Sequence, residues 1–233
     1  MNKAAQNKGF SLIEMAIVIV IISLTIAGII AGKSLVSAGK INAALSEYTQ
    51  LESYINLFQN TYSFLPGDFP DATQYWPGSH NGNGNGALEF WPASETPYHW
   101  QVHLNLAGIL SSPPPARCQH DTPEGISCGY PTQAVSGKKF GWNIASINNE
   151  LYASLSSGSS TSTGWIGGSI SPKIAKLIDS KADDGIANSG LITAINAHYA
   201  HVHFGTNRCI NGSSQYAISQ NHSDPICVLQ WKF

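Results

Sequence analysis

A single carboxylate, Glu14, interrupts an otherwise apolar stretch near the start of the 233-residue chain. The residues from Met15 to Gly32 carry no charge, and with the apolar residues before Glu14 they can form a helix that crosses a hydrocarbon layer of ~30 Å. A lone carboxylate in hydrocarbon is costly, so its presence there usually marks a function and a partner. We expect Glu14 to meet a cation when the stretch is buried. The alternative is an acid among the lipid headgroups of a simple membrane anchor.

A polar repeat further along has ligand types that could bind calcium. Asn81, Asn83 and Asn85 alternate with glycine, as ligands alternate in calcium-binding loops. However, neutral amides replace the usual aspartates, and no acid stands at the twelfth position of the loop. The pattern therefore favours a plain flexible turn, with a calcium site as the alternative.

A second candidate for calcium is acidic. Asp183 and Asp184 precede Gly185, and Asp179 lies one helical turn earlier in the sequence. The same residues are typical of a loop that ends a helix, and this interpretation is favoured over a metal site. We expect no cofactor, and calcium at one of these two segments is the exception that the residues leave open.

Residue types that are common in catalytic sites do not form a recognisable set. His201 and His203 would share one face of a strand, with His198 nearby, but no neighbouring Cys, Asp or Glu completes a metal site. A solvent-exposed face is therefore favoured for them. We find no supported Ser-His-Asp or Cys-His arrangement, and we expect that the protein is not an enzyme.

Composition limits the remaining classes of function. Only 11% of the residues are charged and the formal net charge is −2, so a broad basic face for nucleic acid phosphates is not expected. The chain length allows one ordinary domain beside the apolar stretch. Beyond residue 60, abundant Gly, Ser, Asn and Pro with interleaved Trp and Tyr indicate a loop-rich domain that contains β-strands.

Positive charge sets the expected orientation in the membrane. Lys3 and Lys8 precede the apolar stretch, which keeps the N-terminus in the cytoplasm and places the residues after Lys33 on the other side. All four cysteines lie in this exported part, where disulfides can form.

The four cysteines allow three pairings. The pairs that are nearest in sequence, Cys118–Cys128 and Cys209–Cys227, would close short polar loops, and we expect these two disulfides. A zinc site is the alternative, but neither pair has the two-residue spacing of zinc ligands.

The segment Gly9-Phe10-Ser11-Leu12-Ile13-Glu14 follows a short basic leader and opens the apolar stretch. It resembles the cleavage and methylation site of the type IV pilin and pseudopilin superfamily. The resemblance implies cleavage after Gly9 by a prepilin peptidase, N-methylation of Phe10, and polymerisation. The amino group of Phe10 in one copy could then meet Glu14 of a neighbouring copy in a charge-assisted contact.

Two further features bear on this resemblance. Ala31 stands where type IV pilins usually have proline, so the choice between a pilus subunit and a secretion pseudopilin stays open. The Cys209–Cys227 pair resembles the C-terminal disulfide loop of many pilins.

Apolar periodicity predicts that the helix continues to about residue 60 and packs on a core. The apolar stripe consists of Ile41, Leu45, Tyr48, Leu51, Ile55 and Phe58. Shorter helices are expected at residues 99–110 and 172–180. Strands are expected at residues 140–146, 165–170, 197–204, 216–219 and 226–231. The expected fold is α+β: a long N-terminal helix packed on an antiparallel sheet with disulfide-closed loops.

The expected domain organisation has four parts: a leader at residues 1–9, a membrane-spanning and polymerising half-helix at 10–33, an amphipathic half-helix at 34–60, and an extracytoplasmic head at 61–233. We expect a type IV pilus subunit, and the alternatives are a type II secretion or competence pseudopilin, a minor tip pilin with an adhesive head, or an anchored binding protein that does not polymerise. Expected partners are further copies of the chain, prepilin peptidase and the assembly machinery of the bacterial inner membrane. The final location would be an extracellular pilus or a periplasmic pseudopilus.

Overall fold

The computed structural model describes residues 10–88, 99–111, 130–131, 141–160, 165–196, 209–212, 214–218 and 226–233. These residues form two compact units, Met1–Gly39 and Lys40–Phe233. Helix α1, Leu12–Tyr62, begins in the first unit and ends in the second.

Part of helix α1 supplies one wall of the core of the second unit. Its buried side chains recur at helical spacing, which places them on one face. They are Ile41, Ala44, Leu51, Ile55 and Phe58. Two other members of the predicted stripe, Leu45 and Tyr48, are partly buried and pack against the same core. The predicted amphipathic continuation of the helix is therefore present in the structure.

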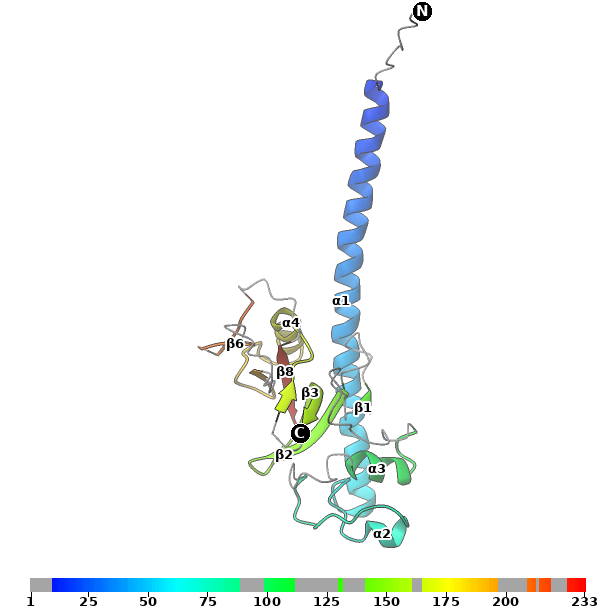
Figure 1. Ribbon diagram of the computed structural model, residues 1–233, viewed down its shortest axis with the longest axis vertical. Helices are drawn as coiled ribbons and strands as arrows, with labels where there is room; N and C mark the ends of the chain where they lie inside the picture. Colours follow the sequence, from blue (N-terminus) through cyan, green and yellow to red (C-terminus); the bar gives the residue numbers. More distant parts are fainter. Residues whose placement is uncertain are drawn as a thin grey trace, which may run out of the picture. The chain divides into compact units, whose positions relative to one another are not determined.

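The second unit contains an antiparallel sheet in the order β1-β2-β3-β8-β5, with β4 paired to β3 (Figure 1). The strands are β1 (Tyr130–Pro131), β2 (Gly141–Ile147), β3 (Glu150–Ser160), β4 (Trp165–Gly167), β5 (Ile192–Asn196) and β8 (Cys227–Lys232). A short hairpin pairs β6 (Ile210–Asn211) with β7 (Gln215–Tyr216). The expected fold, a long helix packed on an antiparallel sheet, is confirmed.

Aromatic side chains join the helix to the sheet. The Tyr48 ring stacks on Trp231 at a centroid distance of 5.7 Å, and Trp231 lies edge-on to Trp142 at 4.8 Å. Trp142 is fully buried, and its indole Nε1 donates a hydrogen bond of 2.9 Å to Glu47 Oε2 on the helix. Buried aromatic pairs of this kind combine a large apolar area with fixed geometry, so they fix the position of the helix on the sheet.

The predicted strands differ from the observed ones in several places. Strand β3 was not expected, because its serines are typical of a loop, yet Leu155 and Ser156 are both buried in the sheet. Ser156 Oγ is satisfied there by a 2.8 Å hydrogen bond from Asn143 Nδ2. Strand β5 was also missed, and the expected strand at 197–204 lies outside the described residues. The prediction at 216–219 corresponds to the shorter β7.

The described residues contain three further helices. They are α2 (Ala72–Tyr75), α3 (His99–Leu106) and α4 (Pro172–Ala182). Helix α3 ends earlier than predicted, because Gly108 follows with a φ of 70° that glycine adopts without strain. Helix α4 begins at the predicted proline and runs two residues further than expected.

The Cys209–Cys227 disulfide is present, with an S–S distance of 2.04 Å. It ties the start of the β6–β7 hairpin to strand β8, and both cysteines are fully buried. The predicted Cys118–Cys128 pair lies outside the described residues.

Candidate functional site

The first turn of α1 contains a reciprocal pair of hydrogen bonds between Ser11 and Glu14. The Ser11 backbone N–H donates to Glu14 Oε2 at 2.7 Å, and the Glu14 backbone N–H donates to Ser11 Oγ at 3.3 Å. Because the helix begins at Leu12, this is a capping box with Ser11 as the N-cap. Ser-x-x-Glu before an apolar run is the usual signature of a capping box, so the sequence carries a signal for this role of Ser11 that the predictions above did not use.

The capping box determines where the carboxylate of Glu14 lies. It is held at the N-terminal end of the helix, where the helix dipole favours negative charge. Ser11 N–H bonds one carboxylate oxygen, and Oε1 of Glu14 has no hydrogen bond within the part of the chain that the structure describes. The geometry therefore leaves Oε1 of Glu14 open as an acceptor, four residues after Phe10, which is 79% exposed.

The apolar residues that follow Glu14 are exposed on every side of the helix within the first unit. Among the described residues, α1 is the one helix long and apolar enough to cross a membrane, and its 18-residue window of mean hydropathy 2.7 has no buried residue. The polar side chains within this stretch are satisfied by their own helix. Ser23 Oγ donates to Ile19 O at 2.7 Å, and Thr25 Oγ1 donates to Ile22 O at 2.8 Å. This surface therefore needs an apolar environment, and Glu14 is the one ionisable residue between Leu12 and Gly32.

The Asn-Gly repeat surrounds a different carboxylate. Asp68 is only 2% exposed and accepts backbone N–H hydrogen bonds from three loop residues. The donors are Gly84 at 2.7 Å, Asn85 at 3.3 Å and Gly86 at 2.7 Å. The loop thus contributes backbone donors to a buried carboxylate, whereas the sequence favoured a plain flexible turn. Calcium binding by Asn81, Asn83 and Asn85 stays a prediction.

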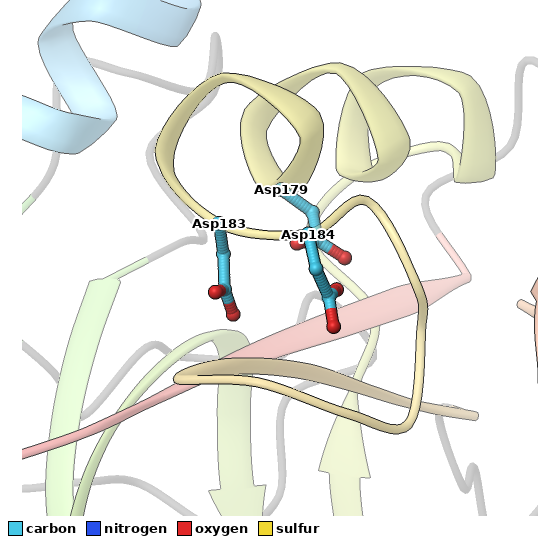
Figure 2. A group of neighbouring side chains, drawn as sticks. All are labelled: Asp179, Asp183 and Asp184. Atoms are coloured by element: carbon cyan, nitrogen blue, oxygen red, sulfur yellow. The ribbon is translucent and has the colours of Figure 1, made fainter.

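Three aspartates at the C-terminal end of α4 come together, as Figure 2 shows: Asp179 lies in the last turns of the helix, and Asp183 and Asp184 follow it. One oxygen from each of Asp179, Asp183 and Asp184 lies within 4.8 Å of the others. Each carboxylate also accepts hydrogen bonds from nearby donors: Tyr216 OH and Gly185 N–H at Asp179, Ile192 N–H at Asp183, and Ser189 Oγ and Ile186 N–H at Asp184. These bonds fit a loop that ends a helix, and calcium here also stays a prediction.

The protonation of these aspartates differs with their surroundings. Burial raises the pKa of Asp179, although the Tyr216 hydroxyl and the Gly185 N–H partly offset this effect. Hydrogen bonds from Ser189 and Ile186 lower the pKa of the exposed Asp184. Asp179 is fully buried and Tyr216 is nearly so, which indicates that their 2.7 Å hydrogen bond anchors the β6–β7 hairpin to α4.

His103, a residue of α3, is fully buried and uses both ring nitrogens. Nδ1 accepts a 2.9 Å hydrogen bond from the Gly67 N–H, so Nε2 carries the proton and donates to His80 O at 2.8 Å. Burial lowers the pKa of His103; the hydrogen bond to the His80 carbonyl partly offsets this effect, and the charge of the His80 side chain adds to the lowering. A protonated ring would lose the bond from Gly67, so the folded state favours the neutral form.

We predict that acid destabilises the second unit through His103. The unfolded histidine binds a proton near pH ~6.5 and the folded one only at lower pH, so stability is complete above that value and falls as the pH drops below it. The measurement is urea unfolding of the full chain in detergent between about pH 7.5 and about pH 5.5. His103→Gln, which can keep both hydrogen bonds but cannot titrate, should flatten this dependence. A slope that is unchanged in His103→Gln, or abolished in the exposed-residue control His80→Gln, contradicts the assignment.

Several predicted site residues lie outside the described part of the chain. Gly9, the residue before the expected cleavage point, is one of them. The cysteines of the first predicted pair and the histidines at positions 198, 201 and 203 are others.

The chain matches the family model of the prokaryotic N-terminal methylation motif at residues 5–30. This motif is the hallmark of the prepilin-type segments of type IV pilins and pseudopilins, so the predicted resemblance is confirmed. It supports a pilin-like or pseudopilin precursor that is anchored in a membrane, and it implies prepilin peptidase processing and polymerisation in general. No curated protein and no solved structure matches the chain.

Proposed function

We propose that the chain is a structural subunit of a type IV pilus, cleaved after Gly9 and polymerised through the first half of α1. The observation that carries this proposal is the combination in one helix of a fully exposed apolar surface and a carboxylate held at its N-terminal turn. The methylation motif covers the same residues. The role is structural rather than catalytic.

The exposed apolar surface accounts for both stages of the proposed life cycle. Leu12, at the start of the helix, is 93% exposed, and the stretch to Val36 is rich in exposed large apolar side chains. Such a surface is stable in a lipid bilayer before assembly, with the second unit on the extracytoplasmic side of the bacterial inner membrane. In the filament, the same surface is covered by the helices of other copies.

Glu14 would set the register of this assembly. Cleavage after Gly9 creates a new amino group on Phe10, four residues before Glu14 in the same chain. In the filament this amino group would lie against Glu14 of a neighbouring copy. A neighbour's amino group can bond the open Oε1 while Ser11 keeps Oε2 in place. The pair replaces an unpaired carboxylate in hydrocarbon with a charge-assisted hydrogen bond, and this exchange favours the polymer.

The abundance of the chain in filaments tests the proposed role. If the chain is a major pilus subunit, it will be the dominant protein in filaments sheared from the cell surface. The measurement is quantitative mass spectrometry of the sheared fraction and the membrane fraction. Recovery only from membranes beside a secretion apparatus would contradict a pilus subunit and indicate a pseudopilin, and recovery as a trace filament component would indicate a minor tip pilin.

A further inference from the structure

Four Asn-Gly pairs occur in the chain, at Asn81, Asn83, Asn85 and Asn211. An asparagine followed by glycine can modify itself, because no Cβ on the next residue hinders the approach. The deprotonated glycine nitrogen attacks the asparagine Cγ, a C–N bond forms, and the side-chain nitrogen leaves as ammonia. Water then opens the cyclic imide to give aspartate or isoaspartate. No oxidant or reductant is needed.

In each of the first three pairs, the glycine nitrogen that would attack is restrained by a hydrogen bond that its N–H donates. Gly84 and Gly86 donate their N–H groups to opposite oxygens of the Asp68 carboxylate, both at 2.7 Å. Gly82 donates to Phe69 O at 2.8 Å. Removing the proton from Gly84 or Gly86 would leave a negative nitrogen facing a buried carboxylate, which costs electrostatic free energy. These glycine nitrogens are therefore poor nucleophiles in the folded chain.

The asparagine side chains of the same loop are also held. Each side-chain oxygen accepts a backbone N–H hydrogen bond, which restrains the rotation that would bring Cγ to the next nitrogen. The donors are Thr73 to Asn81 at 2.8 Å, Asn85 to Asn83 at 3.1 Å, and Ala87 to Asn85 at 2.9 Å. Both reacting groups of each pair are thus restrained.

The fourth pair has neither restraint. Asn211 ends strand β6 at the tip of the β6–β7 hairpin, and both Asn211 and Gly212 are exposed. In the described part of the chain, the Asn211 side chain and the Gly212 N–H make no hydrogen bond. The hairpin is anchored at its other end by the Cys209 disulfide and the buried Tyr216, so its tip reacts without any unfolding of the core.

We propose that Asn211 is a self-modification site of the folded protein, and that the Asp68 carboxylate protects the asparagines of the Asn81–Asn85 repeat from the same reaction. The product at Asn211 places a new negative charge on the exposed hairpin tip. This inference does not depend on the proposed role in a filament.

The test follows deamidation of the full-length chain in detergent micelles, in mildly alkaline buffer, beside the same chain unfolded in guanidinium. Peptide mapping by mass spectrometry resolves the four sites and separates aspartate from isoaspartate. We expect Asn211 to convert at a rate within about threefold of its rate in the unfolded chain. The three loop asparagines should convert at least about tenfold more slowly than in the unfolded chain, because their reaction requires local opening of the loop. Equal protection of Asn211, or loop rates equal to those of the unfolded chain, would overturn the proposal.

Two variants separate the parts of the proposal. Gly212→Ala should slow conversion of Asn211 at least about tenfold by adding a Cβ, and this Cβ has no atom within 4 Å to disturb the fold. Asp68→Asn should raise the rates at Asn83 and Asn85 while leaving Asn211 unchanged. If Asp68→Asn unfolds, hydrogen exchange of the unmodified chain decides the point: slow exchange of the Gly84 and Gly86 amides relative to Gly212 supports protection, and equally fast exchange refutes it.

Discussion

Glu14→Gln is expected to abolish filament formation while the precursor still accumulates, inserts in the membrane and is cleaved. Glutamine has nearly the shape of glutamate and can complete a capping box with Ser11, so the start of the helix is preserved. It removes only the charge that would pair with the Phe10 amine of a neighbouring copy. Breaking one partner of a buried ion pair costs about 3–5 kcal/mol, which applies at every subunit contact of a filament.

The measurement is the yield of sheared filaments, with immunoblots of the membrane fraction to show that the variant is present and processed. Ser11→Ala is the matched control, because it removes the hydroxyl of the capping box but leaves both the carboxylate and the backbone N–H that bonds it. We expect Ser11→Ala to assemble at reduced yield. Normal filaments from Glu14→Gln would show that Glu14 serves the helix cap alone, and the pairing account would be wrong.

Phe58→Ala is expected to lower the free energy of unfolding of the second unit by about 3–5 kcal/mol. The Phe58 side chain is fully buried where α1 meets the residues that follow it. Its ring lies 4.6 Å from that of Tyr62, 6.1 Å from His103 and 6.2 Å from Trp76. Truncation therefore leaves a cavity between rings that are held by other contacts and cannot collapse to fill it.

Chemical denaturation of the full chain in detergent, followed by tryptophan fluorescence, measures this loss. The adjacent Leu57 is a matched control on the same helix turn, because it is 52% exposed. Leu57→Ala should change the free energy of unfolding by no more than about 0.5 kcal/mol. Similar losses for both variants would mean that the observed packing face of α1 is wrong.

The local sequence pattern predicted those features of the fold that depend on residues close to one another in the sequence. The period of the stripe from Ile41 to Phe58 identified the buried face of α1, and the proline at position 172 identified the start of α4. The short sequence separation of Cys209 and Cys227 also identified their bond. In each case residues that are close in sequence carry the signal.

Features that depend on distant residues were not predictable in this way. Strand β3 is buried between β2 and β8, and its serines are tolerated because Asn143 and Gln230 from those neighbours donate hydrogen bonds to them. The Asn-Gly repeat likewise resembles a free turn in the sequence. Its ordering depends on Asp68, which precedes the glycines that bond it by at least 16 residues and which the fold places within the loop. Such partners are brought together only by the fold.

The mass of the N-terminal peptide from the native protein tests the central claim most directly. If a freed amine on Phe10 pairs with Glu14 of a neighbouring copy, the native chain begins at Phe10 and carries one N-methyl group, as the methylation motif implies. The measurement is mass spectrometry of the chain recovered from its own cells. A chain that retains Met1, or that begins beyond the apolar stretch, would contradict the account.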